Sequence, residues 1–381
     1  MAGEQDGVVV MWGDRVSVIR PLERNDLPQV ASLYESVSRS GSSLPPQGLA
    51  GYFERTLLDH PWADPEIPSL VYLDDQGTVK GFIGSHVRRL RLDGKPLRMA
   101  CGGQLMSDPA VRNRAVGTLL LRRFFAGSQD LTMTDGATEA TRRIWSGLGG
   151  SVGHLGSISW VRLFNWGAAG EQALERFGMA AWRPVARPAL WAVQAVANRV
   201  PVISMRVKEP STRAEDLTPK LLLEHLPSVT QHRSLQPAYD EQFLAWLFPE
   251  MAAVRSRGQL VKRLIRGREG RLLGWYVAYL QRRGLSQVMQ IAAGERDAPA
   301  VLDHLFHDAQ RAGVAALTGQ FEPSLFEALA QRSRRCFLHL SANFLVHSRN
   351  PEVLNPILLG RAMLTRMDGE RWMGHHLEPF D

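Results

Sequence analysis

The sequence predicts an α/β protein of the α+β type, built from two units of mixed sheet in tandem. At 381 residues the chain is too long for one ordinary core, so we expect two domains. Strand-like and helix-like segments alternate from Val16 to Leu163, and a similar order recurs from Glu209 to Pro356. We therefore expect domains at 1–164 and 208–381, joined by a helical connector at 165–207.

The first unit opens with a short strand at Val16–Ile19 and a helix that Asn25 and Asp26 cap. The apolar positions of that helix recur every three or four residues, and a second helix is expected at Leu49–Leu58. Hairpins around Asp74–Gly77 and Asp93-Gly94 predict the central strands. The remaining expected elements are strands at 69–73, 78–84, 85–92, 97–106 and 130–134, helices at 117–126 and 136–146, and a strand pair from 150 to 163.

The second unit repeats this order after a helical region at Leu217–Phe248. The expected elements are strands at 261–264, 271–280, 287–292 and 314–319, helices at 298–312 and 323–331, and a closing strand pair from 336 to 346. The order parallels residues 69–163, which favours a tandem duplication.

The connector at 165–207 combines three tryptophans with several arginines and is interrupted by prolines. We expect short amphipathic helices that bridge the domains. A peripheral membrane contact is an alternative, with Trp and Arg at the level of the lipid headgroups, but the prolines keep each helix short and disfavour it.

Composition limits the classes of partner. The formal net charge of +7 favours anionic ligands, yet no basic stripe interleaved with aromatic residues is present, so we do not expect nucleic acid. Two cysteines, Cys101 and Cys336, are too few for a disulfide framework, and neither belongs to a group of Cys and His residues large enough for a zinc site, so neither is expected. The sequence shows no signal segment and no run long enough to span a bilayer, so we expect a cytoplasmic protein.

The most informative stretch is Val111–Leu121, which follows a strand that ends at Ser107-Asp108-Pro109. Arg112, Ala115 and Gly117 lie at the spacing R-x-x-A-x-G, and an apolar helix begins at once. The first turn of a helix offers unpaired N–H groups and a partial positive charge, and small residues let an anion approach the main chain. The segment therefore predicts a diphosphate-binding turn.

This segment, from Leu105 to Leu120, resembles the acyl-CoA signature of the GNAT superfamily of N-acyltransferases. Thr138–Gly150 resembles a second family segment, and Val16–Leu27 resembles the family's opening strand and helix cap. The resemblance implies transfer of an acetyl or other acyl group from acyl-CoA to an amine of a small molecule or peptide, with a homodimer as a possible assembly. The residues that it implies for binding acyl-CoA are Leu105, Ser107, Arg112, Asn113, Arg114, Ala115, Val116, Gly117 and Thr118.

The second unit lacks this spacing. At the corresponding turn it carries Glu295 and Asp297, two carboxylates that would repel a diphosphate. We therefore expect the second unit to be a copy of the fold without the cofactor, which completes the acceptor cleft or a dimer interface.

The usual catalytic residues of the family are missing. The strand at Leu97–Met106 carries no acid, and Trp145 stands where the family often has a proton-donating Tyr. An indole N–H does not give up its proton to a thiolate. The candidates that remain are His154, Asp135 and Glu139, with His86 on a nearby strand. Asp135 could instead cap a helix from Gly136, Glu139 could stabilise a first turn, and His154 could be a turn residue.

Two further hypotheses remain open. A Fem-type aminoacyltransferase also doubles this fold but does not need the diphosphate turn. A regulatory protein could bind acyl-CoA without turnover, which the missing Tyr and strand carboxylate would suit. Under each of these hypotheses, the pair Gly102-Gly103 predicts a bulge or a close approach of a ligand in the strand at 97–106.

Overall fold

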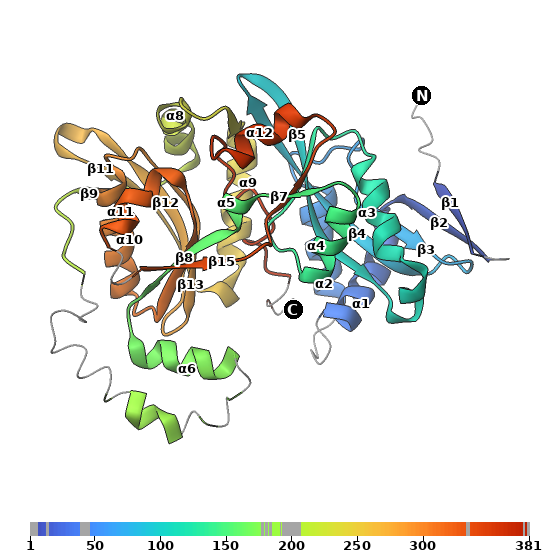
Figure 1. Ribbon diagram of the computed structural model, residues 1–381, viewed down its shortest axis with the longest axis horizontal. Coiled ribbons are helices and arrows are strands. Elements are labelled where there is room, and N and C mark those ends of the chain that lie inside the picture. Colours follow the sequence, from blue (N-terminus) through green and yellow to red (C-terminus); the bar gives the residue numbers. More distant parts are fainter. Residues whose placement is uncertain are drawn as a thin grey trace.

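The computed structural model describes residues 7–12, 15–38, 46–176, 207–332 and 336–375, and also positions 179, 182, 185–190, 192 and 378. The chain forms two mixed sheets with helices on their faces, which confirms the predicted fold class (Figure 1). Among these residues, no helix is long and apolar enough to cross a membrane.

The first sheet has the strand order β1-β2-β3-β4-β5-β6-β16-β7, and β10 pairs with β4. Its strands are β1 (Val8–Trp12), β2 (Arg15–Pro21), β3 (Leu70–Leu73), β4 (Val79–Leu92), β5 (Lys95–Ser107), β6 (Leu131–Thr134), β7 (Ser151–Val152), β10 (Leu235–Pro237) and β16 (Leu345–His347). Strands β4 and β5 are the long central pair.

The second sheet has the order β15-β8-β14-β13-β12-β11-β9. Its strands are β8 (Ile158–Leu163), β9 (Arg213–Asp216), β11 (Gln259–Arg266), β12 (Leu272–Leu280), β13 (Leu285–Ala293), β14 (Ala316–Gln320) and β15 (Cys336–Leu340).

The helices cover both sheets. They are α1 (Leu27–Ser38), α2 (Pro46–Phe53), α3 (Val116–Phe125), α4 (Glu139–Gly147), α5 (His154–Ser157), α6 (Trp166–Arg176), α8 (Pro219–Thr230), α9 (Glu241–Ala253), α10 (Ala298–Arg311), α11 (Phe326–Ala330) and α12 (Pro351–Leu358). Helix α2 continues into a π-helical turn at Glu54–Leu58.

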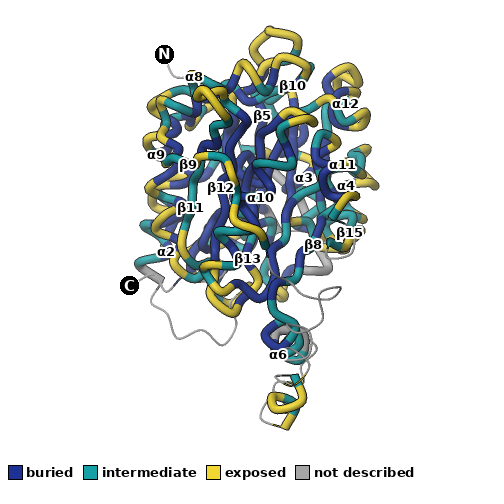
Figure 2. The backbone as a smooth tube through the Cα atoms, turned by 90° about the vertical axis from the view of Figure 1, so that its left-hand side faces the viewer, coloured by how far each residue is buried: buried dark blue, intermediate teal, exposed yellow. Residues whose placement is uncertain are grey.

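One hydrophobic core joins the two units. It runs from Phe53 and Trp62 in the first half to Phe243 and Trp275 in the second, and Trp62 stacks on Phe243 with ring centroids 3.6 Å apart. Figure 2 shows this buried interior passing through the body, while α6 stands outside it. The two halves therefore fold against each other as one body.

Helix α3 packs on the other face of the first sheet, through Val116, Leu120 and Phe124. A side chain at Gly81 in β4 would come within 2.6 Å of the Val116 side chain, so this glycine allows the helix to lie close to the sheet. The start of α3 is thereby fixed relative to the end of β5.

The sequence prediction was wrong about how each sheet closes. The expected pair at 150–163 is split, because β8 lies in the second sheet between β14 and β15. The expected pair at 336–346 is split likewise, because β16 lies in the first sheet between β6 and β7. Each half donates its last strand to the other, and the periodicity of a strand carries no information about its partner. The domain limits at 164 and 208 stay a prediction. Strands β8 and β16 each belong, by sequence, to one predicted domain and lie in the sheet of the other.

Smaller differences concern individual elements. Strand β1 was not expected, β4 is continuous through Ser85, and the helical region at 217–248 is two helices separated by β10. In the connector, α6 and the helical residues 185–190 are described, and Leu190 packs against Gly170. Much of 177–206 lies outside the described residues.

The donated strand β16 contributes a hydrogen bond that we expect to stabilise the first unit. The Trp145 indole is buried and packs edge-on against Phe125, with the ring centroids 4.7 Å apart. Its Nε1–H donates to the Val346 carbonyl in β16 at 3.0 Å. Trp145→Phe should lower the free energy of unfolding by about 1–3 kcal/mol, because it leaves that carbonyl without its donor and a gap beside the ring. Urea denaturation followed by circular dichroism measures this; an unchanged midpoint would contradict the role of this contact.

Candidate active site

The candidate site begins where the central strands separate. Strand β5 pairs with β6 in parallel only from Met99 to Cys101, and beyond that point the two strands diverge. A bulge interrupts the pairing with β4, since Phe82 lies opposite Met106 but Gly84 lies opposite Gly103, and Gln104 has a φ of 50°. This confirms the irregularity predicted at Gly102-Gly103.

A cavity of about 160 Å³ occupies the gap between the diverging strands. Its lining residues come from α1, β4, β5, α3, the end of β6, α4 and the C-terminal segment, and include Tyr34, Gly103, Gln104, Leu105, Thr134, Gly136, Trp145 and Glu370. It is thus assembled from both halves of the chain.

The predicted diphosphate-binding turn follows directly after β5. A 3₁₀ turn spans Pro109–Arg114, Ala115 takes the left-handed conformation at a φ of 48°, and α3 begins at Val116. The N–H groups of Thr118 and Leu119 both donate to the Ala115 carbonyl, at 2.9 and 3.1 Å. The first turn of α3 carries no acidic residue. This strand–turn–helix arrangement is the expected one, although its ligand stays a prediction.

The main chain around Gly117 is open. A Cβ at Gly117 would have its nearest heavy atom at 3.9 Å, the Cδ1 of Ile144. Leu105 lines the cavity, while Ser107 ends β5 opposite Gly81. The side chains of Arg112, Asn113 and Arg114 lie outside the described residues.

The carboxyl group in the cavity is Glu370, which the sequence analysis did not identify. Its Oε1 accepts a hydrogen bond from the Thr134 hydroxyl at 2.9 Å, and the main-chain N–H of Gln104 also donates to the carboxylate. A Cβ at Gly103 or Gly136 would lie 2.6 or 2.7 Å from its two oxygens. Glycine at both positions therefore leaves the room in which this carboxyl group lies between β5 and the end of β6.

Asp135 lies beside Glu370. Its Oδ1 accepts the Glu370 N–H at 2.9 Å, and its carbonyl accepts from Arg371 Nε at 2.6 Å. Among the described residues, Oδ2 is buried and has no hydrogen-bond partner. The expectation that Asp135 caps a helix from Gly136 was wrong, because α4 begins at Glu139 and Thr138 is its N-cap.

Burial and the neighbouring acid together change the acidity of this pair. Burial raises the pKa of Glu370 to about 7, and the Asp135 carboxylate contributes in the same direction. Burial also raises the pKa of Asp135, against the opposing influence of Arg371. Glu370 is therefore close to half-ionised at neutral pH, as a group that exchanges protons near pH 7 must be.

The other two catalytic candidates lie elsewhere. Glu139 is exposed at the start of α4, where it forms ion pairs with Arg142 and Arg143 that lower its pKa to about 2. His154 is exposed at the start of α5 and does not line the cavity. Their catalytic roles stay predictions, and of the three candidates only Asp135 contacts Glu370.

Two other groups behind the bulge are unsuited to chemistry near neutral pH. Burial lowers the pKa of His86 to about 3, so its imidazole is neutral, and its Nε2 lies 3.3 Å from Gln104 Oε1. Burial raises the pKa of the Cys101 thiol well above its usual range. The Gln104 amide nitrogen lies 3.3 Å from His375 Nε2, so these groups hold the bulge in place.

The equivalent gap in the second sheet is filled by the chain itself. Strands β13 and β14 pair only from Leu285 to Gln287. Beyond that point the chain near the C-terminus lies between them, because the Met367 N–H donates to the Met289 carbonyl in β13 at 3.2 Å and the Gln320 amide in β14 donates to the Leu364 carbonyl at 2.8 Å. The Arg366 guanidinium donates to the Thr318 carbonyl in β14 at 3.2 Å and to the Ser159 hydroxyl in β8 at 3.0 Å. At the turn before α10, Asp297 pairs with Arg271 at 2.7 Å. That the second unit binds no cofactor stays a prediction.

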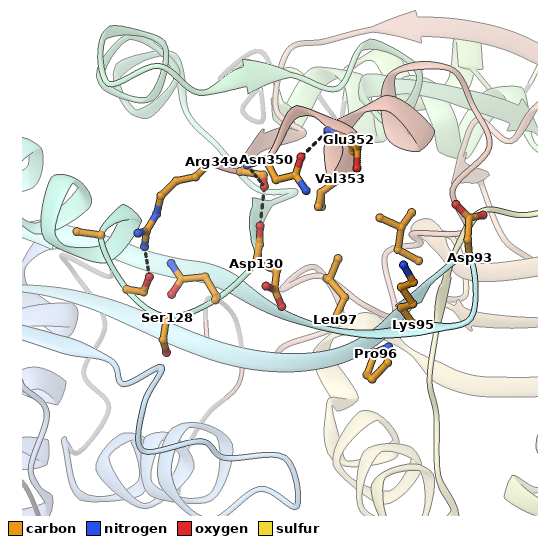
Figure 3. Close-up of a pocket in the computed structure, with 15 residues that line it drawn as sticks. Asp93, Lys95, Pro96, Leu97, Ser128, Asp130, Arg349, Asn350, Glu352 and Val353 are labelled. Atoms are coloured by element: carbon orange, nitrogen blue, oxygen red, sulfur yellow. Dashed lines mark hydrogen bonds between the residues drawn. The ribbon is translucent and has the colours of Figure 1, made fainter.

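A larger groove of about 760 Å³ lies at the opposite end of β5 (Figure 3). It is lined by residues that include Asp93, Lys95, Asp130, Arg349 and Glu352. Since β5 is 13 residues long, the groove and the turn are roughly 40 Å apart along the strand. Among the described residues, no group of three or more His, Cys, Asp and Glu side chains could hold a metal ion.

The raised pKa of Glu370 can be tested directly. Asp135→Asn removes the adjacent negative charge but keeps an oxygen for the Glu370 N–H, so the pKa of Glu370 should fall from about 7 toward its ordinary value of 4.5. Carbon-13 NMR of glutamate carboxyl carbons measures it, with the resonance assigned from Glu370→Gln. A titration that is the same in both proteins would contradict the coupling.

Comparison with known proteins identifies the fold. No protein-family model matches the chain, and no curated protein matches its sequence. Solved structures do match. A GCN5-related N-acetyltransferase from Anabaena variabilis ATCC 29413 has a TM-score of 0.56 at 10% identity, over 89% of this chain and 74% of that one. A protein of unknown function from Enterococcus faecalis V583, described as a probable N-acyltransferase, has a TM-score of 0.53 at 10% identity, over 87% and 72%.

The N-myristoyltransferase of Saccharomyces cerevisiae with bound myristoyl-CoA is similar as well. Its TM-score is 0.52 at 9% identity, over 90% of this chain and 85% of that one. At such low identity these likenesses establish the fold alone. They confirm that the chain has the tandem GNAT fold that the sequence motifs implied.

Proposed function

We propose that this protein is an acyltransferase that moves an acetyl or other acyl group from acyl-CoA to an amine. The reaction would take place in the cavity between β5 and β6, and the acceptor would be a small molecule or a peptide. The observation that carries the proposal is the Glu370 carboxyl group, held in that gap with a pKa raised to about 7. A carboxylate of this kind suits a general base at neutral pH.

The turn before α3 fits the diphosphate of acyl-CoA. Its first helical turn has no acidic residue, and the surface at Gly117 is open to an approaching anion. In our proposal the main-chain N–H groups of 115–117 bind the diphosphate, and the pantetheine arm lies in the gap lined by Leu105 and Trp145. Acyl-CoA would thus extend from the start of α3 toward Glu370.

The reaction needs a base for the amine and a proton for the leaving thiolate. Without substrate, the Gln104 N–H donates a hydrogen bond to the Glu370 carboxylate. In our proposal this N–H donates to the oxygen of the acyl carbonyl instead, and the carboxylate is then free to accept the proton of the amine. The amine nitrogen then bonds to the carbonyl carbon, the carbon–sulfur bond breaks, and the thiolate takes up a proton. The phenol of Tyr34 lines the same cavity and is the donor that we favour for that proton.

Two alternatives make different predictions. The turn after β5 has no use in a Fem-type enzyme, which favours acyl-CoA over aminoacyl-tRNA as the donor. A sensor of acyl-CoA would bind the ligand without turnover, and Trp145 in place of a phenol suits it. Retained binding with no product from any amine would favour the sensor.

The phosphate turn is tested at Gly117. Gly117→Glu places a carboxylate among the N–H donors and should weaken acyl-CoA binding more than tenfold, because like charges repel. Gly117→Ala is the matched control, since its Cβ has room at 3.9 Å, and should bind nearly as the parent does. Calorimetry with acetyl-CoA should find one site per chain, because Leu364 and Met367 occupy the second gap through their main-chain bonds to β14 and β13. Unchanged affinity in a folded Glu variant, or two sites, would overturn the assignment.

The base is tested at Glu370. Glu370→Gln should lower kcat by roughly a hundredfold or more while acyl-CoA affinity changes little, because the amide cannot accept the proton. In the parent, kcat/KM should fall as the pH drops below about 7, since only the ionised carboxylate acts as a base. That acidic limb should be absent in the variant.

Glu322→Gln is a control for the loss of a buried acid. Burial raises the pKa of Glu322 to about 7 as well, but its carboxylate lies 3.6 Å from Arg233, away from the cavity. The control should keep both the rate and the acidic limb. Equal rates in the parent and Glu370→Gln would exclude Glu370 as the base.

A further inference from the structure

The second sheet ends in a strand whose outer edge is uncovered. Strand β15 pairs with β8 on one side and is the last strand in the order of that sheet (Figure 1). Among the described residues, no strand pairs with its other side. The main-chain N–H and C=O groups on such an edge are available to another strand.

Three of the five side chains of β15 are large, apolar and exposed. Phe337, Leu338 and Leu340 are 49%, 56% and 73% exposed. The strand Cys336–Leu340 contains no Asp, Glu, Lys or Arg. Proteins that stay monomeric protect edge strands with charged residues, prolines or bulges, and this strand has none of them.

We propose that β15 pairs with the β15 strand of a second copy of this chain, antiparallel and about a two-fold axis. The pattern of side chains favours this partner over an unrelated strand. With the axis at Leu338, that residue faces its own copy, Cys336 faces Leu340, and Phe337 faces His339. Every apolar side chain then meets an apolar or aromatic neighbour, on both faces of the joined sheet.

The two-fold arrangement also closes the assembly. An isologous contact uses the same surface on both copies and leaves no further β15 edge free. The two second sheets become one continuous sheet across the axis, and the cavities that contain Glu370 belong to the separate first sheets. The dimer is therefore independent of the proposed reaction.

Sedimentation velocity over a range of concentrations tests the pairing. The parent should form a dimer at micromolar concentration, and Leu338→Lys should weaken association roughly tenfold or more, because two like charges would lie directly opposite. Leu359→Lys is the matched control, since Leu359 is 63% exposed at the end of α12 and not in β15, and should remain dimeric. Circular dichroism should show that both variants are folded.

A cross-link tests the register. In the Cys336→Ser background, Leu338→Cys places two thiols opposite each other across the axis, and mild oxidation should give a disulfide-linked dimer. Cysteine in place of Leu359 should give none. A parent that is monomeric at all concentrations would overturn the proposal and leave the edge to a different protein. A dimer that persists in Leu338→Lys and does not cross-link at 338 would place the interface elsewhere.

Discussion

The reciprocal exchange of β8 and β16 is the constraint on which the rest of the structure depends. Strand β16 fills the first sheet between β6 and β7, and β8 fills the second between β14 and β15. Neither sheet is complete without a strand from the other half. Because β16 precedes α12 and the last segment of the chain, the exchange also brings that segment back to the gap between β5 and β6. Glu370 reaches the candidate site as a consequence of this topology.

Buried polar contacts fix the path of that segment. Arg88 in β4 is fully buried and donates to the Asp368 carbonyl at 3.1 Å. The Asp368 carboxylate accepts hydrogen bonds from the Tyr239 hydroxyl and from both the N–H and the hydroxyl of Thr365, the last two at 2.8 Å. A buried charge is costly unless it is paired and hydrogen-bonded, so these contacts tolerate little displacement. They hold the main chain two residues before Glu370.

The sequence predicted the parts of this site that local patterns encode. The turn before α3, the irregularity at Gly102-Gly103 and the tandem order of elements all follow from spacing and periodicity within short windows. Glu370 could not be found in this way, because no periodic pattern marks its segment and its partners Thr134 and Gln104 are more than 230 residues away. The only local signal was the glycine at 103 and at 136, whose missing side chains leave room for a carboxylate. The strand exchange was hidden for the same reason, since a strand's sequence shows that it is half-buried but not beside which strand it lies.

One segment also accounts for the difference between the two halves. The Met367 N–H and the Leu364 carbonyl of this segment bond to β13 and β14, and a few residues later Glu370 lies between β5 and β6. The gap in the second sheet is therefore occupied by main-chain contacts that a ligand would have to replace. The Glu370 carboxylate lies between two glycines and accepts hydrogen bonds from one hydroxyl and one N–H. Because its pKa is about 7, protonation of this group requires little free energy at neutral pH. The same short segment of chain thus fills the gap in the second sheet and places a carboxyl group in the gap of the first.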